Sequence, residues 1–107
     1  MPKIPKEIKR QMERELRQYY DNKKLIKKLQ NDKKTSTRSL IYLEQRILYI
    51  DNVISRLNAF ERQVFDMIFK EKADCIYCQT HFNISKSTYY NVINKSIDIL
   101  AQEWGIV

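Results

Sequence analysis

The chain of 107 residues has one glycine and two prolines, and both prolines, Pro2 and Pro5, lie at its start. Tight hairpin turns depend on glycine, proline and a few other turn residues, so this scarcity argues against a β-rich protein. A glycine-rich loop that could cradle the phosphates of a nucleotide is also excluded. Long periodic segments with few breaking residues instead favour an all-α fold.

Long hydrophobic runs are also missing from the sequence. No apolar run approaches the ~18 residues that a membrane-spanning helix needs. The positive N-terminal segment is not followed by the apolar core of a secretory signal peptide. We therefore expect a cytoplasmic protein with no membrane partner. A hydrophobic content of 43% is ordinary for a folded chain and argues against wholesale disorder.

The chain has only two cysteines and one histidine. Cys75, Cys78 and His81 follow each other at intervals of three, which suggests zinc, but a structural zinc takes four ligands. The same spacing on a helix places both cysteines on one face, where small apolar side chains are ordinary core residues. No arrangement of serine, histidine or carboxylates suggests a catalytic site. We expect no enzymatic activity, no metal and no cofactor.

Five helices are predicted from the spacing of apolar residues, over residues 6–30, 38–57, 59–69, 75–82 and 86–104. A polar connection separates the first two, with Thr35, Ser36 or Thr37 as the next cap. Asn58 and Glu61 form the pattern of a capping box, and Asp74 can cap the fourth helix. Gly105 is expected to stop the last helix.

Residues 38–57 carry the most regular apolar pattern in the chain. It indicates either an antiparallel pair with the first helix or a seam shared between two chains. We expect a mixture, in which the first helix covers part of the stripe and a homodimer buries the rest. The stripe consists of Leu40, Leu43, Ile47, Ile50, Ile54 and Leu57, widened by Tyr42, Tyr49 and Val53.

Most aromatic side chains fall on or beside an apolar stripe and are expected in the core. Trp104 is expected to cover the core formed by the last three helices. Tyr90 falls on a polar face and is a candidate for contact with bases or with the sugar-phosphate backbone. The residues expected to face inward are Tyr19, Tyr42, Tyr49, Tyr89, Phe60, Val64, Phe65, Ile68, Phe69, Ile76, Cys78 or Gln79, and Phe82.

A short run around Asn83 has the pattern of the turn and second helix of a helix-turn-helix. Two apolar residues, Phe82 and Ile84, flank Asn83, and asparagine tolerates the left-handed backbone that ends many helices. Ser85 then offers an N-cap oxygen to the next helix. A helix that exposes donors and acceptors at its N-terminal end suits the major groove of DNA.

The last helix has two different faces. Its apolar stripe is expected to be buried and consists of Tyr89, Val92, Ile93, Ile97 and Leu100. Its opposite face is polar and almost free of acid, and consists of Lys86, Ser87, Tyr90, Asn91, Asn94 and Lys95.

The net charge of +7 is distributed unevenly. Residues 1–38 hold 13 Lys and Arg against 5 Asp and Glu, whereas residues 39–73 hold 5 against 5 and residues 74–107 hold 2 against 3. A basic segment attracts polyphosphate without selecting a base sequence. The alternative is a solvated lysine-rich helix with no partner, and the helix-turn-helix pattern downstream favours nucleic acid.

The segment 57–100 resembles the fourth conserved region of bacterial sigma factors, through Leu57, Glu61-Arg62-x-Val64 and Ile84-Ser85-x-Ser87-Thr88. Over nearly its full length the chain resembles the small phage transcriptional activators of the RinA/ArpU type. That resemblance is carried by Glu15-Leu16-Arg17-x-Tyr19, Lys23-Lys24-x-Ile26 and Asn83-Ile84-Ser85-x-Ser87-Thr88-x-Tyr90. The chain departs from the motif at Gln79 and Asn83, where a small residue and a glycine are usual.

The resemblance implies a basic helical hairpin over residues 1–57 and a three-helix helix-turn-helix domain over residues 58–107. It implies an activator of late phage or prophage genes that binds promoter DNA and is located at the nucleoid when bound. The basic hairpin would add phosphate contacts, join two subunits or touch RNA polymerase, and these alternatives stay open. Two asparagines that can each pair with adenine suggest a site containing A·T pairs. The predicted base-edge readers are Lys86, Ser87, Tyr90, Asn91 and Asn94, and the predicted DNA-backbone contacts are Ser85, Thr88 and Lys95.

Two alternative interpretations stay open at this point. A small terminase-like packaging protein also binds phage DNA through a helix-turn-helix and has no catalytic site, but is expected as a ring. A protein-interaction adaptor would use the hairpin to bind a host protein and would never meet DNA. The near-neutral charge of residues 74–107 is consistent with the adaptor.

Overall fold

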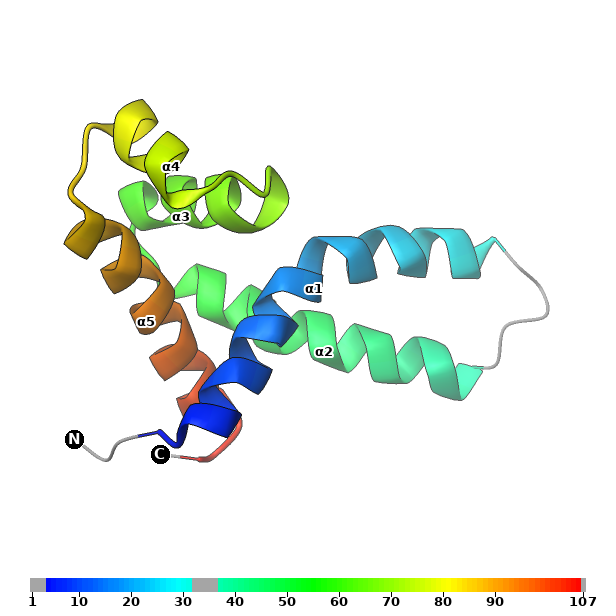
Figure 1. The fold of residues 1–107 in the computed structure, drawn as a ribbon. Helices are drawn as coiled ribbons and strands as arrows, with labels where there is room; N and C mark the ends of the chain where they lie inside the picture. Colours follow the sequence, from blue (N-terminus) through cyan, green and yellow to red (C-terminus); the bar gives the residue numbers. More distant parts are fainter. Residues whose placement is uncertain (1–3, 32–36, 107) are drawn as a thin grey trace.

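The computed structural model describes residues 4–31 and 37–106. Over these residues the protein is all-helical and has no strand, as the scarcity of turn residues predicted (Figure 1). Both ends of the second helix and the end of the last helix differ slightly from the prediction, since the second helix spans Thr37–Ser55 and the last ends at Glu103. The elements are α1 (Lys6–Gln30), α2 (Thr37–Ser55), α3 (Ala59–Phe65), the π-helical segment η1 (Asp66–Lys70), α4 (Cys75–Phe82) and α5 (Lys86–Glu103).

Side-chain caps fix where the helices of the C-terminal half begin. Asn58 Oδ1 accepts a hydrogen bond from the Glu61 N–H at 2.8 Å, and Glu61 Oε1 accepts one from the Asn58 N–H at 2.8 Å. The predicted capping box of α3 is therefore confirmed. Asp74 accepts a hydrogen bond from the Tyr77 N–H at 2.7 Å and caps α4 as predicted. The cap candidates Thr35 and Ser36 of α2 lie outside the described residues.

α1 and α2 pack side by side, and the C-terminal half of α1 and the N-terminal half of α2 extend away from the other helices (Figure 1). Arg46 of α2 donates two hydrogen bonds to the Glu15 carboxylate of α1, each 2.9 Å long. The hydroxyl of Tyr19 in α1 donates to the carboxylate of Asp51 in α2. The apolar stripe of α2 is thus covered in part by α1, and its Leu43, Ile50 and Val53 are buried.

One buried cluster of side chains joins the N-terminal pair to the C-terminal helices. α1 packs against η1 and α5 as well as against α2. Met12 and Leu16 of α1 are fully buried in the same cluster as Phe65 of α3 and Leu100 of α5. The pair of α1 and α2 therefore does not fold around a core of its own, and α5 rests partly on α1.

The third predicted helix, over residues 59–69, changes its form after Phe65. η1 continues the chain with wider turns, and the Glu71 N–H donates to the Asp66 carbonyl, five residues back, at 3.0 Å. Lys72 follows with φ 56°, in the left-handed region. The Ala73 N–H then bonds to the Met67 carbonyl at 3.0 Å, which closes the end of the segment.

Four residues that were predicted to face the core are exposed, which makes those predictions wrong. Tyr42 and Tyr49 lie on α2 with exposed fractions of 61% and 40%, because they flank the face that α1 covers. Phe60 is 40% exposed, and its ring lies edge-on to the Phe82 ring with centroids 6.0 Å apart. Ile76 is 74% exposed, because α4 is short and buries only Cys78.

Trp104 is half-buried against the main cluster, and its ring lies edge-on to Tyr49 of α2 with centroids 6.2 Å apart, so it packs on α2 and not on the last three helices alone as expected. Gly105 follows α5 with φ 72°, which agrees with its predicted role as a helix stop. Among the helices of residues 4–31 and 37–106, none is long and apolar enough to cross a membrane.

Candidate nucleic-acid interface

The turn between α4 and α5 has the local geometry that its sequence predicts. Asn83 adopts φ 53° and ψ 51°, the left-handed conformation, and its N–H caps α4 on the Gln79 carbonyl. The Ile84 N–H bonds to the same carbonyl at 3.0 Å, and Ile84 packs against the core. Ser85 Oγ then accepts a hydrogen bond from the Thr88 N–H at 3.1 Å and starts α5. Only three residues, Asn83, Ile84 and Ser85, therefore separate the two helices.

α5 is held in place by its buried face, which contacts α1, α2, α3 and α4. Ser96 is the buried polar residue of this face, and its hydroxyl donates to the Val92 carbonyl at 2.8 Å, so its hydrogen-bonding need is met within the helix. The predicted apolar stripe is buried as expected. The buried residues of α5 are Tyr89, Val92, Ile93, Ser96, Ile97, Ile99, Leu100 and Ala101.

The predicted reading face lies on the molecular surface at the N-terminal half of α5. Tyr90 is 45% exposed, and the ammonium of Lys86 lies 6.0 Å from the centroid of its ring. Amide, hydroxyl and ammonium groups thus occupy one face of a helix whose other face is packed. The exposed members of the predicted set are Ser85, Lys86, Ser87, Tyr90, Asn91, Asn94 and Lys95.

All three predicted DNA-backbone contacts, Ser85, Thr88 and Lys95, are already engaged within the protein. Lys95 forms an ion pair with Glu61 of the capping box, with Nζ–Oε1 at 2.8 Å. Thr88 is half-buried, and its hydroxyl lies 3.0 Å from that of Ser85. Partial burial would raise the pKa of the Glu61 carboxyl, but the Asn58 N–H and Lys95 outweigh burial and lower that pKa. Glu61 therefore stays charged and holds α3 to α5.

The reading face carries little positive charge of its own. On α5 the only cations are Lys86 and Lys95, and Glu61 neutralises Lys95. Neutral amide and hydroxyl groups can select bases, but they add little to the attraction of phosphate. The cations that would bind the phosphates of a duplex must therefore come mainly from another part of the chain.

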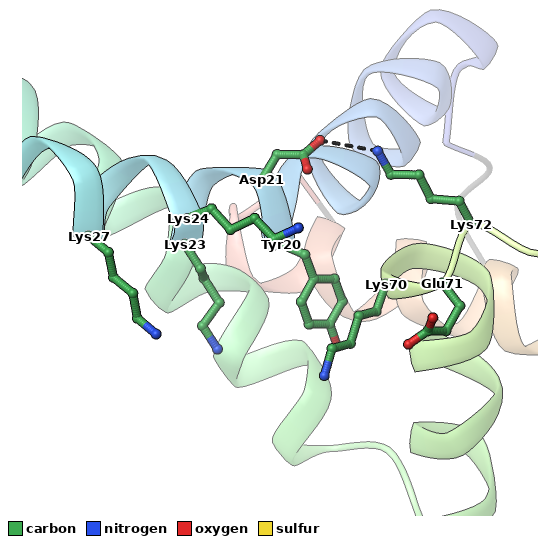
Figure 2. Close-up of a pocket in the computed structure, with 8 residues that line it drawn as sticks. All are labelled: Tyr20, Asp21, Lys23, Lys24, Lys27, Lys70, Glu71 and Lys72. Carbon is green, nitrogen blue, oxygen red and sulfur yellow. Dashed lines mark hydrogen bonds and ion pairs between the residues drawn. The ribbon is translucent and has the colours of Figure 1, made fainter.

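A basic pocket lies between α1 and the end of η1, and sequence reasoning did not anticipate it (Figure 2). It has a volume of about 420 Å³, and five lysines line it. Lys70 and Lys72 come from a segment of balanced charge, so composition alone gave no reason to join them to the basic N-terminal third. The lysines are Lys23, Lys24, Lys27, Lys70 and Lys72.

The residues that were weighed as metal ligands do not assemble into a site. Within the part of the chain that the structure describes, no three His, Cys, Asp or Glu side chains are placed to hold a metal ion. Cys78 is buried, and burial raises the pKa of its thiol. Cys75 Sγ accepts a hydrogen bond from Gln79 Nε2 at 3.1 Å. Both cysteines act here as small packing residues of α4.

Comparison of the chain with models of protein families, with curated proteins and with solved structures gives no match.

Proposed function

We propose that this protein is a sequence-specific DNA-binding regulator of transcription. In this proposal α3, α4 and α5 form a three-helix helix-turn-helix domain, α5 enters the major groove, and the basic pair of α1 and α2 supports it. The observation that carries the proposal is the N-terminal half of α5, where polar side chains share one exposed face directly after a tight turn. That arrangement fits the recognition helix of a helix-turn-helix.

The chemistry of the face suits direct contact with base edges. The side-chain amides of Asn91 and Asn94 can each donate to and accept from an adenine, which favours sites that contain A·T pairs. Lys86 and Ser87 stand at the first turn, where a recognition helix approaches the bases most closely. Tyr90 offers a hydroxyl and an exposed ring beside them. Ser85, Thr88 and Lys95 would meet the sugar-phosphate backbone, with Lys95 exchanging Glu61 for a phosphate.

The resemblance to RinA/ArpU-type activators extends the proposal to a biological setting. In that setting the protein activates the late packaging and structural genes of a phage or prophage. Promoter DNA would be its first partner and RNA polymerase its second. Leu48 and Ile41, which are 58% and 49% exposed on α2, are where a second copy would pack if the protein is a dimer.

The main test of this proposal is the substitution Asn91→Ala, studied on a duplex selected by the wild-type protein from a random pool. Loss of a bidentate contact to adenine should weaken binding to the selected duplex by about 1–3 kcal/mol, or about ten- to a hundredfold. Binding to duplexes of random sequence should hardly change, because they offer no matched base. Fluorescence anisotropy with both duplexes measures the two affinities.

Asn52→Ala is the matched control, because Asn52 is also an exposed asparagine within a helix but lies on α2. It should bind both duplexes as the wild type does. Equal losses for Asn91→Ala on the selected and the random duplex would remove Asn91 from the base-reading residues.

A second candidate function, a protein-interaction adaptor, is favoured by one observation. Ile76 and Tyr77 on α4 are 74% and 54% exposed, and neighbouring exposed apolar side chains often mark a protein contact. In the activator these residues would belong to the surface that meets RNA polymerase. In the adaptor they would form the whole functional surface, and no duplex would bind to α5.

A further inference from the structure

The basic pocket between α1 and η1 is built from two segments that are far apart in sequence. Lys23 and Lys27 project from α1 to one side of Tyr20, and Lys70 reaches toward the Tyr20 ring from the end of η1 (Figure 2). The Lys70 ammonium lies 5.9 Å from the centroid of that ring. The hydroxyl of Tyr20 donates to the Asp66 carboxylate of η1, which ties the two walls together. The lysines are therefore gathered by the tertiary fold and do not simply follow one another along a helix.

The pocket retains an excess of positive charge after its internal contacts are counted. Five lysines line it, against the two acids Asp21 and Glu71. Asp21 is paired with Lys72 over 3.5 Å, but both side chains are more than half exposed, so the pair is weak. Lys24 and Lys27 form no ion pair with any residue that the structure describes. An anion with several negative charges would therefore find free ammonium groups on the α1 wall.

Lys72 has a backbone conformation that lysine rarely adopts. Its φ of 56° lies in the left-handed region, where glycine or asparagine carries less strain. Asn83, the other non-glycine residue with positive φ among the described residues, is of a type that tolerates this conformation. A strained residue that persists in a pocket points to a use for its side chain. At Lys72 that side chain supplies an ammonium to the pocket.

The pocket lies apart from the reading face. In Figure 1 the first turn of α5 stands at one side of the molecule, whereas the middle of α1 and the end of η1 lie toward the other side. The described part of the molecule measures 47 × 32 × 23 Å. A duplex in contact with the first turn of α5 would have to extend or bend around the protein to reach the pocket.

We propose that this pocket binds two or more adjacent phosphate groups, as a nucleic-acid backbone or a free polyphosphate presents them. The choice of nucleic acid as the main source rests on the proposed function. In the proposed DNA complex, the pocket binds the DNA backbone beyond the groove that α5 occupies. It thereby supplies the affinity for phosphate that α5 lacks. Binding at this place adds affinity without base selection, and DNA that bends toward it is held more tightly.

The test compares two double variants of the full chain that remove the same charge from the same helix. Lys24→Gln with Lys27→Gln removes two of the three lysines on the α1 wall of the pocket. Lys6→Gln with Lys9→Gln removes two exposed lysines of α1 that lie outside it, near the opposite end of the helix. On a random-sequence duplex, the pocket pair should weaken binding on the order of tenfold or more at 0.1 M salt and make the log–log salt slope less steep by about 2. The control pair should change affinity about threefold or less, since distant charges are screened.

Lys72→Gly separates binding from folding. Glycine relieves the left-handed conformation, so this variant should melt at the same temperature as the wild type or higher, and it should still bind the duplex more weakly. Inorganic tripolyphosphate, titrated by NMR, provides an arm without DNA. Chemical-shift changes at Lys24, Lys70 and Lys72 that are lost in the pocket double variant would support the phosphate site. Binding of the duplex at the same residues would identify nucleic acid as the source of the phosphates, and its absence would identify free polyphosphate.

Equal losses for the pocket pair and the control pair, or binding of neither probe at the pocket, would overturn the inference. That failure is distinct from failure of the proposed function. If Asn91→Ala has no effect on any duplex while the pocket double variant still weakens phosphate binding, the assignment of α5 as the DNA-reading helix is wrong. The phosphate-binding role of the pocket is then still supported.

Discussion

Replacing Leu16 with alanine should lower the free energy of unfolding by about 2–5 kcal/mol, because it removes a fully buried side chain and leaves a cavity. For a domain whose whole stability is about 5–15 kcal/mol, this is a large part. The cavity would lie in the cluster that contains Phe65 and Leu100, so the loss of stability should extend from α1 to α3 and α5. Chemical denaturation followed by far-ultraviolet circular dichroism measures the change.

Leu25→Ala provides the matched control on the same helix, because Leu25 is 41% exposed. It should cost less than about 1 kcal/mol, as surface substitutions usually do. Trp104, the only tryptophan, follows α5 and packs against Tyr49 of α2, so its fluorescence reports on the contact between α5 and α2. Its fluorescence midpoint should fall with Leu16→Ala by the same amount as the circular dichroism midpoint. A tryptophan midpoint that does not move would show that α1 and the C-terminal helices unfold independently.

Raising the salt concentration from 50 to 200 mM should weaken DNA binding by about a thousandfold. About 5–6 phosphate contacts give a log–log slope near −5, and a fourfold rise in salt then costs about three powers of ten. This expectation rests on the charge of residues 1–38, which hold 13 Lys and Arg and 5 Asp and Glu. Anisotropy titrations of a random-sequence duplex across this salt range measure the slope.

The result depends on cations that are not already neutralised within the protein. Arg17, Arg46 and Lys95 form ion pairs with glutamates, so they are expected to contribute less to the slope. Lys24 and Lys27 are expected to contribute more. A slope near zero would show that phosphate contacts do not contribute to binding, even if a selected duplex still bound to α5.

Local features of this fold could be predicted from the sequence, because their causes lie within a few residues. The cap at Ser85 and the box formed by Asn58 and Glu61 each need only a side chain and an N–H group three residues away. The left-handed Asn83 is fixed by the preference of asparagine itself. The all-α class follows in the same way from the scarcity of breaking residues.

Features that depend on packing between distant segments could not be predicted. Ile76 reads as a core residue in sequence, but α4 buries only one narrow face, so it is 74% exposed. Tyr42 lies beside the stripe of α2 yet outside the width that α1 covers. Lys70 and Lys72 join the α1 lysines only because η1 packs on α1, which no local pattern encodes.

For the candidate site, the sequence was sufficient to place the reading face on the surface, since spacings of three and four separate it from the buried stripe. The sequence was not sufficient to show that Lys95 already forms an ion pair with Glu61. The partner of a surface lysine depends on which helix lies opposite, and α3 reaches α5 only through the tertiary fold. Lys95 remains in the proposed site as a residue that must change partners on binding.

NMR can show whether the exposed N-terminal half of α5 reads DNA. A duplex selected from a random pool is titrated into isotope-labelled protein, and NMR follows the backbone and side-chain amides. We expect the largest shifts within residues 86–95, including the side-chain amide signals of Asn91 and Asn94. A duplex that binds tightly while those signals stay in place, with shifts confined to α1 and η1, would contradict this expectation.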